Sequence, residues 1–256
     1  MHVSCLDVPR AQGHIEDIKA KYGDASNAYR VRVLGEFPTS DDETVIPLAL
    51  VLGAVGRNVS TLDYCPVWGV DVARFGDDRT ALAKRQKNKL LEPVKSWNST
   101  DLMATVGKIK AEYDATPYDA RPKEILIDVI GLGAGVYDRC KELGLPARDI
   151  NVGEAAASRE NCARLRDELW FKGREWFQDK ACSMPQDEAL IAELTAPTYS
   201  FTSTGKMVVE SKADMKKRGV RSPDLADAFL LTFACGERRK ERYRRPEPRN
   251  YSAWAV

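Results

Sequence analysis

Histidine is scarce in this sequence. It has two in 256 residues, His2 and His14, and both lie near the start. The sequence has no G-x-S-x-G motif to supply a nucleophilic serine, and only these two histidines could act as its base, so catalysis by a Ser-His-Asp triad is not expected. The six cysteines include no C-x-x-C pair, which is the spacing that structural zinc sites use. These absences exclude triad hydrolases and zinc modules, and we expect reduced thiols, which are typical of the cytosol.

Long apolar runs and net charge are also lacking. The longest apolar stretch, 46–55, contains Pro47 and is far shorter than the ~20 residues of a membrane helix. We expect neither a signal peptide nor membrane contact. No G-x-x-x-x-G-K-[ST] motif is present, so no P-loop ATPase activity is expected. With 39 basic and 38 acidic residues the net charge is +1, which argues against a protein that coats nucleic acid by charge alone.

The order of the expected elements indicates an α/β fold with a mixed sheet flanked by helices. Three strands come first, at 67–73, 80–84 and 90–97. The turns between them are too short for a parallel crossover, which predicts antiparallel pairing. Helices and strands then alternate, at 102–113, 124–128, 134–143 and 149–152. A hairpin at 199–210 precedes a last helix, for which we expect Ser222 as the N-cap and Pro223 as the first residue.

Four aspartates stand where apolar residues are expected. Asp71 interrupts the apolar strand at 67–73, and Asp128 ends a buried strand. Asp224 and Asp227 are three residues apart in an otherwise apolar helix and so project from one face of it. Burying an unpaired carboxylate costs several kcal/mol at least, so such positions need a compensating group.

A divalent cation is the simplest compensating group. Carboxylates are hard oxygen ligands, which Mg²⁺ and Mn²⁺ prefer. Two such ions held ~3.5–4 Å apart stabilise the attacking and the leaving oxygens of phosphodiester hydrolysis. The ordered set of acids therefore indicates a two-metal site made of Asp71, Asp128, Asp224 and Asp227.

Each aspartate also has a structural interpretation. Asp71 can be a strand-end carboxylate that accepts backbone hydrogen bonds, and Asp128 can be a turn residue. Asp224 lies where an acid favours the helix dipole, whereas Asp227 is deeper in the helix and has no such explanation. The combination of all four, in this order along the chain, is what favours a functional site.

A glycine-rich segment follows Asp128. Gly131, Gly133 and Gly135 come after a strand and open a helix, as in a dinucleotide-binding fold. The third glycine is one residue too early for G-x-G-x-x-G, and the expected acid ~20 residues later is matched loosely at best. We interpret the glycines as a tight turn that lets the backbone pass close to the acidic site.

Basic residues lie close to the acidic pair along the chain. Lys212, Lys216, Lys217, Arg218 and Arg221 precede the last helix, and they are candidates for phosphate contacts. A solvated helix face is the alternative interpretation. The segment from 237 to 249 has seven basic and three acidic residues, and we expect it to be disordered.

Three segments resemble the motifs of a known family. They are GVDVARFGDD (69–78), IDVIGLGAGVYD (127–138) and SPDLADAFLLTFA (222–234). Together they are similar to the C-terminal nuclease domain of phage terminase large subunits, which has a ribonuclease H-like fold. The segment YRVRVLGEFP (29–38) resembles the connection between the ATPase and nuclease domains of that family. The third motif is also similar to the closing motif of RuvC-type junction resolvases.

The resemblance implies a function and a division of the chain. It implies an endonuclease that cuts concatemeric DNA during genome packaging, with Asp71, Asp128, Asp224 and Asp227 as ligands of Mg²⁺ or Mn²⁺. Its partners would be double-stranded DNA, the terminase small subunit and the portal, in the cytoplasm of the bacterial host. Residues 1–65 would be a linker stub with short helices, 66–236 the nuclease domain, and 237–256 a basic tail. A structure-selective junction resolvase and a non-catalytic DNA-binding or assembly module remain alternatives.

Overall fold

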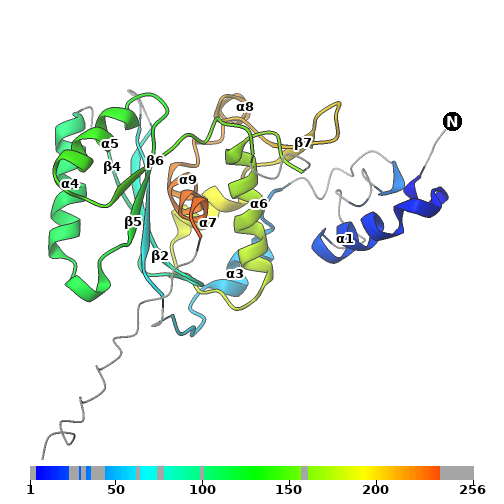
Figure 1. Ribbon diagram of the computed structural model, residues 1–256, viewed down its shortest axis with the longest axis horizontal. Coiled ribbons are helices and arrows are strands. Elements are labelled where there is room, and N and C mark those ends of the chain that lie inside the picture. Colours follow the sequence, from blue (N-terminus) through cyan, green and yellow to red (C-terminus); the bar gives the residue numbers. More distant parts are fainter. Residues whose placement is uncertain are drawn as a thin grey trace, which may run out of the picture.

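A six-stranded mixed sheet organises the described part of the chain (Figure 1). The computed structural model describes residues 4–22, 29, 33–35, 44–61, 64–73, 78–98, 101–156 and 161–236. The basic tail expected at 237–256 lies outside these residues, as does the segment 36–43 that separates the first elements from the rest.

The strands follow the order that the sequence predicts. They are β1 Val67–Asp71, β2 Thr80–Gln86, β3 Lys89–Leu90, β4 Lys95–Trp97, β5 Glu124–Asp128 and β6 Ala147–Ile150. The sheet order is β3-β2-β1-β5-β6, and β4 also pairs with β2. Strand β1 is antiparallel to β2 and parallel to β5, which is itself parallel to β6. The expected mixed sheet, with antiparallel strands followed by parallel ones, is confirmed.

The segment 90–97 forms two short strands instead of the one expected. Strands β3 and β4 both pair antiparallel with β2, and the residues between them leave the ladder. Pro93 lies in this gap, and a proline cannot donate a backbone hydrogen bond to a neighbouring strand. The break therefore has a local cause in the sequence.

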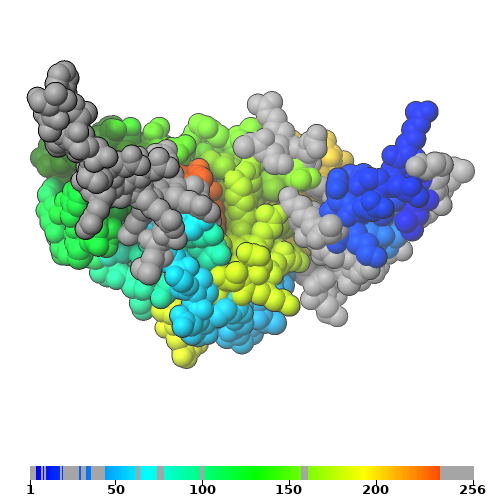
Figure 2. All heavy atoms as spheres, turned by 60° about the horizontal axis from the view of Figure 1, so that its bottom comes forward, coloured from blue at the N-terminus to red at the C-terminus, as the bar shows by residue number. Residues whose placement is uncertain are grey.

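Helices cover both faces of the sheet (Figure 1). The α-helices are α1 Gln12–Tyr22, α3 Leu48–Ala54, α4 Leu102–Ala115, α5 Gly133–Glu142, α6 Leu165–Gln178, α7 Glu188–Thr195, α8 Lys212–Lys217 and α9 Asp224–Leu231. Short 3₁₀ helices span Cys5–Asp7, Pro9–Ala11, Tyr118–Ala120 and Thr232–Ala234. Helices α4 and α5 form one layer, and α3, α6, α7 and α9 form the other. Helix α1 lies at the end of the molecule opposite α4 and α5 (Figures 1 and 2). A separate hairpin consists of β7 Tyr199–Phe201 and β8 Met207–Val209.

Side chains of β1 and β5 alternate between the two layers. One set packs with residues of α4 and α5, namely Trp68, Val70, Ile125 and Ile127. Val67 and Leu126 pack in the opposite layer with residues of α6 and α9. Because alternation continues to the ends of the strands, Asp71 and Asp128 lie on the α6–α9 face of the sheet.

The last helix begins differently from the prediction. Helix α9 starts at Asp224, its N-cap is Pro223, and the cap makes no side-chain hydrogen bond. The carboxylate of Glu193 in α7 instead accepts hydrogen bonds from Leu225 N and from the N–H of the next residue, at 2.7 and 3.2 Å. A residue far away in the sequence thus satisfies the first turn of α9, and Ser222 does not act as its cap.

Two further properties concern the absences noted in the sequence. Among the helices within the described residues, none combines the length and the apolar character needed to cross a bilayer. None of the six cysteines forms a disulfide, and three of them are buried and three are partly buried.

Candidate active site

Two of the candidate aspartates end neighbouring strands. Asp71 is the last residue of β1, and Asp128 is the last residue of β5. These strands are parallel, with Val70 opposite Ile127, so the next residue of each lies beside the other at the carboxyl edge of the sheet. The apolar run before each aspartate fixes the strand, and the strand pairing fixes the two carboxylates relative to each other.

A glycine lets helix α9 bring the other two aspartates to this edge. A β-carbon at Gly69 of β1 would overlap the carbonyl oxygen of Ala228 in α9. The helix therefore rests directly on the backbone of β1, an approach that only glycine permits. Asp224 and Asp227 follow one another by three residues in α9, so both face the strand ends.

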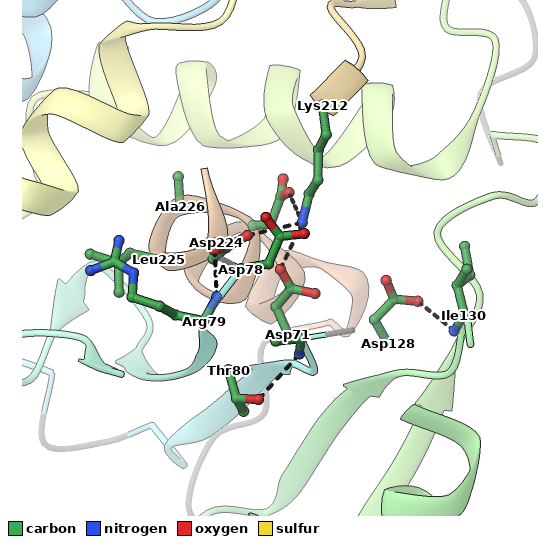
Figure 3. Close-up of polar contacts among 12 residues, drawn as sticks. Asp71, Asp78, Arg79, Thr80, Asp128, Ile130, Lys212, Asp224, Leu225 and Ala226 are labelled. Carbon is green, nitrogen blue, oxygen red and sulfur yellow. Dashed lines mark hydrogen bonds and ion pairs between the residues drawn. The ribbon is translucent and has the colours of Figure 1, made fainter. Parts of the chain in front are cut away.

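One ammonium group joins three of the four carboxylates (Figure 3). Lys212 Nζ lies 3.0 Å from Asp71 Oδ2, 3.3 Å from Asp224 Oδ1 and 3.1 Å from Asp227 Oδ2. Asp128 stands beside this group, and its Oδ1 accepts a hydrogen bond from the backbone N–H of Ile130 at 3.1 Å. The structure therefore brings the sequence-predicted aspartates together and places a lysine among them.

Asp227 is held by two side chains of α6. Trp170 Nε1 donates a hydrogen bond to Asp227 Oδ1 at 3.0 Å, and Arg166 Nε lies 3.5 Å from the same oxygen. Arg166 also donates through Nη1 to the backbone oxygen of Glu210 at 3.0 Å. Sequence reasoning missed both residues of α6. Their spacing of four, which puts them on one helix face, was the signal available in the sequence.

Asp224 is held from the opposite side. The backbone N–H of Arg79 donates to Asp224 Oδ2 at 2.9 Å, and the Arg79 guanidinium pairs with Glu193 at 2.6 Å. Glu193 also accepts hydrogen bonds from the first turn of α9. It therefore contacts both Arg79, which binds Asp224, and the helix that begins at Asp224. Burial raises the pKa of Glu193 to about 7, against the backbone hydrogen bonds and Arg79, which lower it. Glu193 was not singled out from the sequence because its contacts are all non-local.

Burial and mutual repulsion weaken the acidity of the strand-end aspartates. Burial raises the pKa of Asp71 to about 7, with Lys212 opposing and the carboxylates of Asp227 and Asp224 adding to the increase. Burial also raises the pKa of Asp128. The carboxyl of Asp71 therefore keeps its proton to higher pH than an ordinary aspartate does.

Asp227 and Lys212 are both stabilised in their charged forms. Burial acts against ionisation of Asp227, but Arg166, Lys212 and Trp170 outweigh it and lower the pKa of this carboxyl. Burial also disfavours the charged form of Lys212, yet the three surrounding carboxylates raise its pKa well above the usual value. An ionised Asp227 and a charged Lys212 thus form the centre of the cluster at neutral pH.

The four carboxylates suit a hard divalent cation, and the Lys212 ammonium occupies the position among them that such a cation would take. The four aspartates offer carboxylate oxygens, which Mg²⁺ and Mn²⁺ favour. Within the described residues, no group of three or more acidic, cysteine or histidine side chains is spaced to hold a metal ion as it stands. The Lys212 ammonium partly neutralises the carboxylates in its place.

An open groove gives access to the cluster. It has a volume of about 380 Å³, and both Asp71 and Asp128 line it. Arg164, Arg166 and Lys212 line it as well, so acidic and basic side chains face the same space. A polyanion that entered this groove would meet cations beside the carboxylates.

Four of the basic residues predicted to contact phosphate have different surroundings. Lys212 lies in the carboxylate cluster, and Lys216 pairs with Asp78 at 3.0 Å while its side chain stays half exposed. Lys216, Lys217 and Arg218 do not line the groove, and the last two have ion-pair partners, Asp214 for Lys217 and Glu210 for Arg218. The structure thus places two of these residues at or near the cluster.

The glycine-rich segment after Asp128 forms a tight turn. Gly131 has a φ of 78°, in the region that favours glycine. A β-carbon at Gly133 would overlap the backbone oxygen of Asp128. The glycines therefore allow α5 to start directly beside the end of β5, as expected for a turn next to the acidic site.

The comparisons with known proteins give a likeness of fold. No protein-family model matches the chain, and no curated protein sequence matches it significantly. The nuclease domain of the large terminase subunit gp2 of bacterial virus Sf6 superposes with a TM-score of 0.61 at 19% identity, over 75% of this chain and 99% of that one. The large terminase nuclease of thermophilic phage G20c with bound magnesium gives 0.56 at 14% identity, over 77% and 98%. This chain has the fold of a phage terminase nuclease domain.

The terminase nuclease fold confirms the fold predicted from the three motifs. At these identities the likeness concerns the arrangement of the sheet and its helices. Other structures of the same two proteins include a lysine-to-alanine mutant of the Sf6 domain with manganese or calcium, and the G20c domain with cobalt. Domains with the terminase nuclease fold are thus known to bind divalent metals.

Proposed function

We propose that this protein is a divalent-metal-dependent DNA endonuclease, the nuclease domain of a phage or prophage terminase large subunit. The observation that carries the proposal is the convergence of Asp71, Asp224 and Asp227 on one cation, with Asp128 beside them at the same sheet edge. The four carboxylates outnumber the two cations among the described residues that contact them, Lys212 and Arg166, which leaves negative charge for a metal ion to neutralise. The terminase nuclease fold supports the same conclusion.

The four aspartates would hold one or two ions of Mg²⁺ or Mn²⁺. Such ions supply an activated water and neutralise the charge that develops on the leaving oxygen of a phosphodiester. The chain's own residues keep the ligands in place. Trp170 and Arg166 orient Asp227, and the backbone of residue 79 orients Asp224. Lys212 balances three of the carboxylates and would compete with a metal ion for them.

The substrate would be double-stranded DNA. Arg164 and Arg166 line the groove over the cluster together with the carboxylates, which suits a phosphate next to metal ions. Lys212 and Lys216 are the predicted phosphate contacts that the geometry favours, and Lys217 and Arg218 stay predictions. By extension from the named relatives, the chain would act on concatemeric DNA in the cytoplasm of a bacterial host, together with a terminase small subunit and a portal.

Plasmid cleavage tests the proposal. The protein should nick and linearise supercoiled plasmid with Mn²⁺ or Mg²⁺ and stop in EDTA. Asp71→Asn should abolish cleavage, whereas Asp138→Asn, an exposed aspartate on α5 in the opposite layer, should not. Cleavage by Asp71→Asn at the parent rate would contradict the assignment of the site. A strong preference for four-way junctions over linear duplex would identify a junction resolvase instead.

A further inference from the structure

A second groove adjoins the carboxylate cluster on the side of α8 and the start of α9. It has a volume of about 640 Å³, and its lining includes Arg79, Asn98, Lys216, Arg221 and Ser222. We call it the Arg221 groove. Its walls at residues 78 and 224 are shared with the groove over the cluster, so the two hollows meet there. A nucleic-acid strand with one phosphate at the cluster extends from it in two directions, and one of them leads here.

Three cations line the Arg221 groove, and one of them has no counterion among the described residues. Arg79 pairs with Glu193, and Lys216 pairs with Asp78. Arg221 is exposed and has neither an ion pair nor a hydrogen bond to another described residue. A guanidinium held at a groove wall without a partner suits a phosphate, which it can contact through two parallel N–H bonds.

The neighbouring serine has an unused hydroxyl. Ser222 is 5% exposed, and its Oγ is buried without a hydrogen-bond partner in the described part of the chain. The role of helix cap does not account for this hydroxyl, because Glu193 satisfies the first turn of α9. A buried hydroxyl without a partner costs free energy, so rotation of the Ser222 side chain that brings Oγ from its buried position to a phosphate in the groove would be favoured.

The turn before these residues aligns them along the groove. Gly219 has a φ of 75°, and its N–H donates to Lys216 O at 3.0 Å. The N–H of Val220 donates to Met215 O at 2.9 Å, which completes a Schellman ending of α8. Residues 220–222 then run along the wall of the Arg221 groove towards α9. The position of Arg221 is therefore set by the backbone and not by a charge partner.

We infer that the Arg221 groove binds a phosphodiester of the DNA strand that continues from the reacting phosphate, through Arg221 and Ser222. The inference rests on the proposed function and adds a subsite to it. This subsite takes part in binding polymeric substrate and has no role at the reacting atoms. Its loss should therefore weaken the binding of DNA and leave a substrate with a single phosphate unaffected.

Duplex binding measured against salt concentration tests this subsite. A labelled duplex is titrated in the Asp71→Asn background, which keeps the strands uncut. Arg221→Gln should weaken binding about tenfold, and should lower the slope of log affinity against log salt by about 0.9, the value for one phosphate contact. Ser222→Ala should weaken binding a few-fold without lowering the melting temperature. Arg139→Gln, an exposed arginine of α5 paired with Glu142, is the matched control and should change neither quantity.

The same variants without the Asp71 change separate the subsite from the proposed function. With Mn²⁺, hydrolysis of bis(p-nitrophenyl) phosphate should be equal in Arg221→Gln and the parent, while cleavage of duplex falls. Unchanged affinity and salt slope in Arg221→Gln would overturn the subsite, as would displacement of duplex by inorganic phosphate at matched ionic strength. If the parent hydrolyses neither substrate, the proposed function fails, and the salt series still decides whether the Arg221 groove contacts a phosphate.

Discussion

The carbonyl oxygen of Ala228 in α9 lies directly against the backbone of Gly69 in β1. Replacement of Gly69 by alanine should push the helix away, cost about 1–3 kcal/mol of unfolding free energy, and separate Asp71 from Asp224 and Asp227. Urea denaturation and metal-dependent plasmid cleavage measure the two effects.

The control for this substitution is Gly107→Ala in α4, where an added β-carbon meets no atom within 4 Å. It should raise stability by about 0.5–1 kcal/mol, because alanine favours a helix. Equal stabilities of Gly69→Ala and the parent would show that α9 does not rest on β1 as described.

Removal of the Lys212 ammonium should change the response of the protein to metal. Lys212→Ala leaves three carboxylates without their shared cation, so the metal-free protein should lose about 1–2 kcal/mol of stability. This is less than the about 3–5 kcal/mol of a fully buried pair, because a third of the lysine side chain is exposed. Mn²⁺ should then raise the melting temperature more than in the parent. Thermal denaturation in EDTA and in Mn²⁺ measures both effects.

Lys216→Ala is the matched control for that experiment. Lys216 is one turn further along α8, and its partner Asp78 is outside the carboxylate cluster. Its removal should leave the shift caused by Mn²⁺ unchanged. A smaller shift in Lys212→Ala than in the parent would mean that the lysine assists metal binding and does not compete with it.

The stability of the metal-free protein should fall as pH rises from about 4 to 7. Burial raises the pKa of Asp71 to about 7, so in this range the folded state keeps a proton that the unfolded state, with a pKa of about 3.9, has lost. Glu193, whose pKa is also raised to about 7, acts with the same sign. Urea denaturation in EDTA at pH 5 and pH 7 measures the change.

Asp71→Asn should make this pH dependence shallower without removing it, because Glu193 still titrates. A mutant whose stability depends on pH as steeply as that of the parent would show that the carboxyl of Asp71 ionises normally.

Glu193 should contribute to both the stability of the fold and the activity of the site, although it lies on α7 and is not one of the four aspartates. Glu193→Ala leaves the N–H groups of Leu225 and Ala226 and the guanidinium of Arg79 without their acceptor. We expect a loss of about 1–3 kcal/mol and reduced cleavage, since Asp224 begins the helix that is released. Glu188→Ala, an exposed acid on the same helix, should cost less than about 1 kcal/mol. Equal losses in the two variants would remove Glu193 from the support of the site.

The sequence predicts the strand half of the site well. Apolar runs that end in an acid locate Asp71 and Asp128 at strand ends, and short turns followed by long connections give the mixed sheet. The aspartates of α9 are also visible, because acids are conspicuous in an apolar helix. These patterns involve residues close together in the chain, so they can be recognised from a single sequence.

Contacts between distant segments were not predictable in the same way. Trp170 and Asp227 are 57 residues apart, and Glu193 meets Leu225 across 32. Ser222 has the sequence of a helix cap, yet a tertiary acceptor takes that role. Lys212 lies among the carboxylates, and its contact with Asp71 spans 141 residues, so it could not be read from the place of the lysine in the sequence.

The pairing of β1 with β5 gives the four carboxylates unequal freedom. Asp71 and Asp128 end two strands of one hydrogen-bonded ladder, so their separation is set by backbone geometry. Asp224 and Asp227 belong to a helix that is seated on that ladder by packing and by side-chain contacts. The distance between the strand-end pair, Asp71 and Asp128, and the helix pair, Asp224 and Asp227, can therefore change to fit one ion, two ions or a lysine. Substitutions beneath α9 can alter it without touching a single ligand.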